Sequence, residues 1–177
     1  TNVGAGLPII NTLSNLVASG DKVISIKAVL SGSLNFVFNN FSDKKNFHDT
    51  VKQAQFEGYT EPDPRIDLSG IDVARKILIL ARENGVEMEI EDIKNKSFLT
   101  QKNLESGSVD DFYETLIEDE AHFQKLYASA KASPTRLTPS KFMVPLLMLT
   151  TFSRKSTEAA WFCSTNCMIC FSFRESF

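Results

Sequence analysis

The sequence predicts an α+β fold that forms one domain or slightly more. Residues 21–30 alternate between polar and β-branched or apolar side chains, as a strand with one wet face does. Segments on both sides of this strand place apolar residues at helical spacing. Of the 177 residues, 42% are hydrophobic, which is enough to bury a core.

Charge and hydrophobicity exclude several classes of partner. The net charge of −3 provides no basic surface for nucleic acid. No apolar run reaches about 18 residues, the length of a membrane span, and no signal peptide opens the chain. We therefore expect a soluble, cytoplasmic protein that binds neither nucleic acid nor membrane.

The first residues predict a tight glycine turn that leads into a helix. Pro8 suits the first turn of that helix, and the apolar stripe follows at Ile9, Leu13, Leu16 and Val17. The turn is superficially similar to the glycine-rich fingerprint of dinucleotide sites. The third glycine of that pattern falls on Ile9, however, and no strand-forming sequence precedes it. We do not predict a nucleotide site here.

The strand at 21–30 is followed by two short helices. The run Ser31-Gly32-Ser33 turns the chain into the first, which carries three phenylalanines at 36, 38 and 41. The serines have two open interpretations, helix capping or a functional role. The second helix is expected at 46–57 with Asn46 as its N-cap, Asp49 at the third position and Gly58 just after its end. His48 is predicted to be a surface residue.

Residues 54–76 are unusually rich in charge. Four carboxylates follow Gly58, at Glu61, Asp63, Asp67 and Asp72, together with Arg65, Arg75 and Lys76. Pro62 and Pro64 predict a stiff, non-helical connection over 59–68. Ser69 is then expected to cap a helix that runs to about residue 84 and that Gly85 closes.

The carboxylates of this segment have two interpretations. They could form a polar site, or they could be solvated loop acids, with Asp72 a helix cap and Asp72–Lys76 a surface pair. A proline-stiffened loop that enters a mostly buried helix favours the site, because a flexible surface loop needs no stiffening. The predicted buried face of that helix is Ile71, Ala74, Ile77, Leu78 and Ala81.

The remainder divides near residue 133. A turn and a strand are predicted at 89–99, and one broken or two consecutive helices at 108–132, capped by Ser108. Residues 133–177 hold all three cysteines and few acids, and we expect poor packing at least as far as Ser140. The three cysteines at 163, 167 and 170 have the spacing of an iron–sulfur cradle, but other features of such a site are lacking, and we favour neither a cluster, a zinc site nor a disulfide.

The charged segment resembles a family signature. The matching run is Ala54-x3-Gly58-Tyr59-Thr60-Glu61-Pro62-Asp63-Pro64-x2-Asp67-Leu68-x-Gly70-x-Asp72-x3-Lys76. It is similar to the signature of homoserine dehydrogenases, including the enzymes fused to aspartate kinase. The resemblance also covers residues 1–8 and 30–36, extends to about residue 100 and is lost near residue 133.

This resemblance implies a fold and a domain organisation. Residues 1–132 would form a truncated substrate-binding catalytic domain, with helices packed on one face of an incomplete β-sheet. Residues 133–177 would be a divergent tail, which we attribute to a reading-frame shift near residue 133. Thr1 is not an initiator methionine, so we expect a fragment that lacks the nucleotide-binding part and is inactive by itself.

The resemblance also implies an activity. It would be the NAD(P)-dependent interconversion of L-homoserine and L-aspartate 4-semialdehyde, in threonine and methionine biosynthesis. Lys76 would move the proton, with Asp72 holding it, and Glu61 would bind the substrate ammonium with support from Asp67. Tyr59 would shape the amino-acid pocket, which the turn containing Gly32 and Ser33 would line.

Cofactors and partners follow from the same resemblance. NADPH or NADH would be bound mainly by the missing part, and Na⁺ by the backbone carbonyls of Val3, Ala5 and Leu7. The full-length enzyme would be a homodimer that contacts itself through its sheet. The rival hypothesis is a non-catalytic remnant that binds an amino acid or serves only as an oligomerisation contact.

Overall fold

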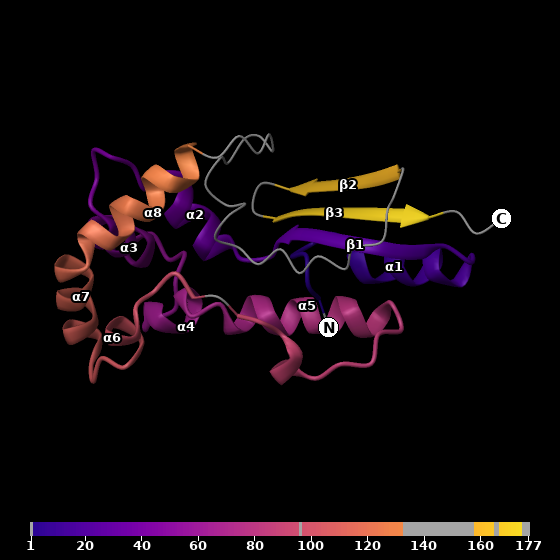
Figure 1. The fold of residues 1–177 in the computed structure, drawn as a ribbon, viewed down its shortest axis with the longest axis horizontal. Helices are drawn as coiled ribbons and strands as arrows, with labels where there is room; N and C mark the ends of the chain where they lie inside the picture. The colour runs from indigo at the N-terminus through magenta and orange to yellow at the C-terminus, as the bar shows by residue number, and fades with distance from the viewer. Residues whose placement is uncertain (1, 96, 133–157, 165–166, 175–177) are drawn as a thin grey trace. The chain divides into compact units, whose positions relative to one another are not determined.

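The computed structural model describes residues 2–95, 97–132, 158–164 and 167–174, and the chain divides into two compact units. The first unit contains the described residues of 1–31, 73–95 and 149–177. The second contains those of 32–72 and 96–148. Helices together with a three-stranded sheet confirm the predicted α+β class (Figure 1).

The first unit contains the sheet. Its strands are β1 (Lys22–Val29), β2 (Glu158–Ser164) and β3 (Cys167–Arg174), in the order β1-β3-β2, and both pairings are antiparallel. Val29 lies opposite Met168 at one end of the β1–β3 pair. The predicted strand at 21–30 is confirmed as β1, whereas the two strands of the tail were not predicted. The expected poor packing near residue 140 falls outside the described residues.

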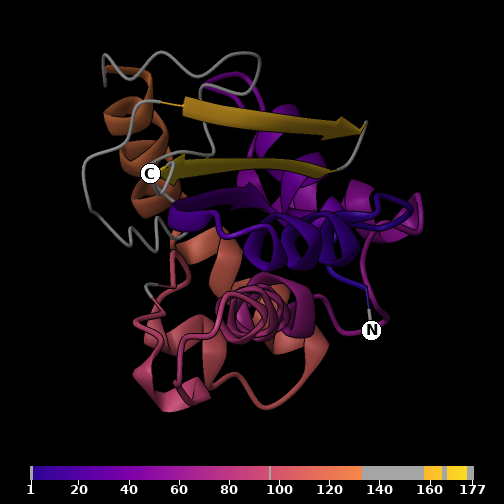
Figure 2. The same ribbon diagram turned by 90° about the vertical axis from the view of Figure 1, so that its right-hand side faces the viewer.

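Helix α1 (Ile9–Ala18) packs beside β1 (Figure 2). The turn before it contains Gly4, where an added Cβ would lie 2.7 Å from Cγ1 of Ile9. That close approach explains the glycine without any nucleotide. Ile9 and Leu13 of the predicted stripe are buried.

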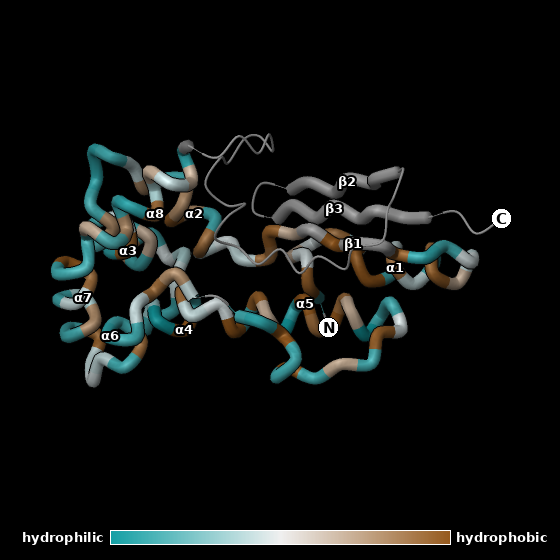
Figure 3. Tube along the Cα trace, viewed as in Figure 1, coloured by the Kyte–Doolittle hydropathy of each residue, from teal (hydrophilic) through white to brown (hydrophobic). Residues whose placement is uncertain are grey.

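Helix α5 (Ile71–Glu83) follows the charged segment and contributes Val73 onward to the first unit. Figure 3 shows apolar and polar residues alternating along it. The predicted buried face was partly wrong, because Ile71 is 48% exposed while Val73 and Leu80 are buried. Gly85 ends the helix as predicted, with a left-handed φ of 77°.

The second unit consists of helices. They are α2 (Gly32–Asn40), α3 (Phe47–Phe56), α4 (Pro64–Leu68), α6 (Gln101–Leu104), α7 (Val109–Glu118) and α8 (Glu120–Ala132). Helix α3 packs against α2, α7 and α8. Of the two alternatives predicted for 108–132, one broken helix or two consecutive helices, the structure shows two, α7 and α8. The Ser108 hydroxyl caps α7, as predicted, by accepting from the Asp111 N–H.

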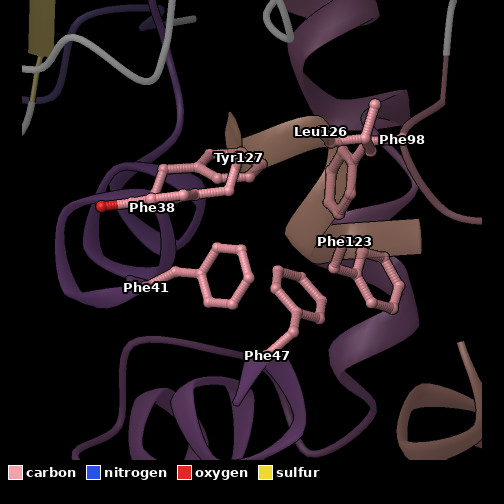
Figure 4. Close-up of a pocket in the computed structure, with 7 residues that line it drawn as sticks. All are labelled: Phe38, Phe41, Phe47, Phe98, Phe123, Leu126 and Tyr127. Atoms are coloured by element: carbon pink, nitrogen blue, oxygen red, sulfur yellow. The ribbon is translucent and has the colours of Figure 1, made fainter. Parts of the chain in front are cut away.

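An aromatic core holds these helices together (Figure 4). The rings of Phe47 and Phe123 stack with centroids 4.1 Å apart, and Phe98 meets Phe47 edge-on at 6.0 Å. The cluster lines a partly open pocket of about 10 Å³, room for about one water, but its walls are almost entirely apolar. The lining residues are Phe38, Phe41, Phe47, Phe98, Phe123, Leu126 and Tyr127.

Two local predictions were wrong, and a third was incomplete. The connection at 59–68 is not wholly extended, because Pro64 opens the short helix α4 and Asp63 caps it. Ser69 was expected only to open α5, but it also ends α4: its hydroxyl donates to the Ile66 carbonyl at 2.9 Å and accepts from the N–H of Ile71, the first residue of α5, at 3.4 Å. Residues 89–99 form a 3₁₀ turn, Ile90–Asp92, and no strand is seen there in the part that the structure describes.

His48 was also predicted incorrectly. Its side chain is largely covered, its ring meets that of Tyr113 edge-on at 5.5 Å, and Nδ1 lies 2.9 Å from the Asp49 carboxylate. It belongs to the contact between α3 and α7. Over the described ranges, no helix is long and apolar enough to cross a membrane.

Candidate functional site

The Asp67 carboxylate is the centre of a polar cluster in the second unit. The Ser33 hydroxyl donates to Oδ1 at 2.7 Å, and the backbone N–H of Glu61 donates to Oδ2 at 2.8 Å. Ser33 is buried in the first turn of α2, and Asp67 lies on α4. Both carboxylate oxygens are therefore fixed by donors from different segments, and three of the predicted site residues come together.

The Glu61 side chain is exposed. Across the described residues no hydrogen bond or ion pair holds its carboxylate, whereas its backbone is tied to Asp67. Pro62 restricts Glu61 to extended conformations. The chain thus presents a fixed backbone with a carboxylate that is accessible to a cationic ligand.

Tyr59 packs on α2, the helix that carries Gly32 and Ser33. Its ring stacks on that of Phe36 in α2, with centroids 4.1 Å apart, and the residue is 40% exposed. Gly32 begins the same helix beside Ser33. Tyr59 and Gly32 are therefore linked to the Asp67 cluster through α2.

Lys76 lies in the first unit on α5 and is partly buried. Its Nζ donates to the Leu30 carbonyl at 2.9 Å. Asp72 precedes it by one turn of the same helix and is exposed. The predicted support of Lys76 by Asp72, and the meeting of Lys76 and Glu61 at one substrate, stay predictions.

Arg65 anchors the start of α4. Its Nη2 lies 2.6 Å from the Asp63 carboxylate, and its Nη1 donates to the Ser106 carbonyl in the turn before α7. The Asp63 carboxylate also accepts from the Arg65 backbone N–H at 3.0 Å. The hydrogen bonds from the Arg65 side chain lower the pKa of Asp63. Sequence analysis found these charges but not their role as an anchor.

A second anchor was missed entirely. Gln55 of α3 donates through Nε2 to the Pro62 carbonyl at 2.8 Å, and its Oε1 accepts from the Tyr113 hydroxyl at 2.9 Å. Burial, with a smaller contribution from the charge of Asp63, raises the pKa of Tyr113 to about 12, so the hydroxyl keeps its proton at neutral pH. Since Gln55 and Tyr113 are 58 positions apart, no local pattern could have revealed the pair.

Thr60 is the remaining polar side chain of interest. Its Oγ1 is buried, and none of the described residues provides it with a hydrogen-bond partner. A buried hydroxyl without a partner is unfavourable. In the sequence, only its place in the signature run at 54–76 marked Thr60 as a residue of interest.

The turn at residues 3–7 was predicted to bind Na⁺ through its backbone carbonyls. Ala5 has a left-handed φ of 52°, and the Leu7 carbonyl already accepts from the Ile9 N–H at 2.8 Å. Val3 is buried. These observations establish the turn but no ligand set, so the cation site stays a prediction.

Comparison with known proteins identifies the family. The model of the homoserine dehydrogenase family matches residues 8–154, which is most of the chain. The chain belongs to the homoserine dehydrogenase family. This confirms the resemblance carried by the signature at 54–76.

Homoserine dehydrogenase relatives are longer than this chain. The bifunctional aspartokinase/homoserine dehydrogenase 2 of Zea mays, a chloroplastic protein, is 45% identical over 131 residues, which are 74% of this chain and 14% of the maize protein. The bifunctional enzyme of Haemophilus influenzae is 45% identical over 132 residues, 75% of this chain and 16% of that protein. The chain therefore spans about one seventh of these relatives.

Two solved structures are similar to this chain. A Candida auris protein of unknown function is 46% identical, with a TM-score of 0.68 over 73% of this chain and 38% of its own. A putative homoserine dehydrogenase from Archaeoglobus fulgidus, 24% identical, has a TM-score of 0.51 over 66% of this chain and 35% of its own. The second shows the fold alone.

Proposed function

We propose that this chain is the substrate-binding part of a homoserine dehydrogenase, which interconverts L-homoserine and L-aspartate 4-semialdehyde in threonine and methionine biosynthesis. The observation that carries the proposal is the Asp67 cluster, in which one carboxylate accepts from Ser33 and from the Glu61 backbone. Glu61 and Asp67 lie within the family signature at 54–76, and Ser33 lies in the resembling stretch at 30–36. The cluster supports a site that recognises a cationic group.

Glu61 and Asp67 would recognise the ammonium group of the substrate. A cation that leaves water needs a carboxylate partner, and charge-assisted hydrogen bonds are the strongest kind. The Glu61 carboxylate is exposed and its backbone is fixed, so it can meet the ammonium with little rearrangement. Asp67 would hold Glu61 and Ser33 in place, while Tyr59 and Gly32 would border the bound amino acid.

Lys76 would transfer the proton. When the alcohol is oxidised to the aldehyde, the hydroxyl loses a proton and the adjacent carbon loses a hydride. In this proposal Nζ of Lys76 takes the proton, and in the reverse direction it returns the proton to the oxygen. The Leu30 carbonyl, 2.9 Å from Nζ, would orient the amine, and Asp72 would steady it from one turn away.

NADP or NAD, when bound, accepts the hydride, and the reduced form donates it in the reverse direction. The glycine turn before α1 does not fit the dinucleotide fingerprint, because Ile9 stands at the third glycine position and Gly4 is needed for its close contact with Ile9. No step is therefore assigned to residues of this chain for cofactor binding. The inactivity of the chain by itself stays a prediction.

Calorimetry with L-homoserine tests the proposed site. We expect the chain to bind homoserine at millimolar concentration and Glu61→Gln to weaken binding about tenfold or more, because a hydrogen bond between charged groups is lost. Glu57→Gln is the matched control, since Glu57 is also an exposed glutamate of this region and makes the same charge change. Glu57→Gln should leave the affinity for homoserine unchanged.

Two results would contradict the proposal. One is the absence of homoserine binding by the unaltered chain, and the other is an equal affinity of the Glu61 and Glu57 variants. Either result would favour the rival, a non-catalytic remnant with a role in subunit contact. Exposure of Phe56 (92%) and Ile66 (60%) favours that rival, because large exposed apolar side chains suit a contact with another protein surface.

Oligomeric state and location complete the proposal. We propose a homodimer formed through the sheet, in which β1 and β2 are the outer strands of the described part. Sedimentation velocity measures this directly. A cytoplasmic location is retained as part of the proposal, although the maize relative is described as chloroplastic.

A further inference from the structure

The backbone around Glu61 is held from both sides. Its own N–H donates to Asp67, and the carbonyl of the next residue, Pro62, accepts from Gln55. Both bonds are 2.8 Å long and lie within the second unit. These two bonds, on the peptide before Glu61 and on the peptide after Pro62, restrain the direction in which the Glu61 side chain leaves the backbone.

The Pro62 carbonyl determines which way the Gln55 amide faces, because it can only accept a hydrogen bond and therefore requires the donating Nε2. The Tyr113 hydroxyl, which can donate or accept, donates to Oε1 and holds the amide in this orientation. A reversed amide would place two acceptors together at Pro62. Tyr113 is buried, so this orientation is protected from water.

The hydrogen bonds form a continuous series through the second unit. It runs from Tyr113 in α7 to Gln55 in α3, enters the loop at Pro62, and leaves it at Glu61 for Asp67 and Ser33. The loop has a separate anchor at Arg65, which contacts Asp63 and Ser106. Loss of Gln55 therefore leaves the loop attached while removing one of the two restraints next to Glu61.

We propose that Gln55, held in place by Tyr113, is a positioning residue that preorganises the Glu61 carboxylate for the substrate ammonium. This proposal rests on the proposed function, because it gives Gln55 and Tyr113 a role at the same ammonium site as Glu61. Gln55 acts through the Pro62 carbonyl and does not touch the substrate.

Gln124 provides a matched control. Its Nε2 donates to the Ser42 carbonyl at 3.3 Å and to Glu120 at 2.8 Å, so it too ties a helix to a loop carbonyl in the second unit. In the part of the chain that the structure describes, no hydrogen bond joins Gln124 to a residue of the series. Gln55→Met and Gln124→Met remove equivalent amides, and a purely structural role for Gln55 would make the two variants alike.

The experiment measures homoserine affinity by calorimetry well below the unfolding midpoint, which is recorded for each variant. Gln55→Met should weaken binding about three- to tenfold, the range expected for one neutral hydrogen bond, while Gln124→Met should not change it. Tyr113→Phe should weaken binding in the same direction. Its effect should largely disappear in the Gln55→Met background, because Tyr113 acts through Gln55.

Amide hydrogen exchange at Glu61, followed by NMR, separates this proposal from the proposed function. Gln55→Met should accelerate exchange of the Glu61 N–H, and Gln124→Met should not. If the unaltered chain binds no homoserine, the proposed function fails, while the exchange result still decides whether Gln55 restrains Glu61. The positioning role would be overturned if the Glu61 N–H exchanged at the same rate in Gln55→Met as in the unaltered chain. It would also be overturned if Gln55→Met and Gln124→Met bound homoserine with equal affinity.

Discussion

At the residue scale, Thr60 is poorly matched to its surroundings. Its buried Oγ1 has no hydrogen-bond partner among the described residues, in contrast to Thr50, whose hydroxyl donates to the Asn46 carbonyl at 2.9 Å. Burying a hydroxyl without a partner removes its bonds to water and replaces them with nothing. The two threonines therefore give opposite expectations for the same substitution.

Thr60→Val should stabilise the chain by about 1 kcal/mol or more, since the unmet hydroxyl is replaced by a methyl group of similar size. Thr50→Val should destabilise it by about 1 kcal/mol, because a satisfied hydrogen bond is lost. Urea unfolding of both variants measures the free energies. Destabilisation of similar size in both would show that the Thr60 hydroxyl does have a partner.

At the element scale, local sequence patterns predicted where helices begin and end. They did not always predict which side chains cap those ends. Gly58 follows α3 as predicted, with a left-handed φ of 77°. Asn46 occupies the N-cap of α3, also as predicted, but its side chain makes no capping hydrogen bond. Glu120 of α8 accepts instead from the Phe47 N–H at 2.8 Å, across 73 positions.

Glu120→Ala should therefore destabilise the chain by about 1 kcal/mol, the usual effect of losing an N-terminal cap. Glu120→Gln should destabilise the chain less than Glu120→Ala, because the amide oxygen still accepts the hydrogen bond from Phe47. It should still destabilise the chain to some extent, because the favourable negative charge near the helix N-terminus is lost. Glu114→Ala, at an exposed position on α7, is the control and should be near neutral. The idea is wrong if Asn46→Ala, rather than Glu120→Ala, has the larger effect on unfolding by urea.

At the scale of the whole molecule, the second unit depends on its aromatic core. Phe47 is fully buried at the start of α3 and meets Phe41, Phe98 and Phe123. Phe56, at the other end of the same helix, is 92% exposed. The amphipathic pattern of α3 alone does not distinguish these two phenylalanines.

Phe47→Ala should destabilise the chain by about 3–5 kcal/mol through the loss of buried contacts and the cavity that remains. Phe56→Ala should change stability by no more than about 0.5 kcal/mol. Thermal and urea unfolding monitor both variants. Equal destabilisation would mean that Phe56 is buried in the protein in solution, for example against a second copy.

The sequence by itself determined the features that depend on neighbouring residues: the β1 strand, the glycine-terminated helices α3 and α5, and the family signature. It misplaced α4 because two closely spaced prolines indicate extended chain, whereas the second of them is also a good first residue for a helix. Tertiary structure alone decided which polar groups meet: Ser33 with Asp67, Tyr113 with Gln55, and Glu120 with Phe47. These pairs are separated by 34 to 73 positions, and their contact depends on how the helices pack, which local spacing does not encode.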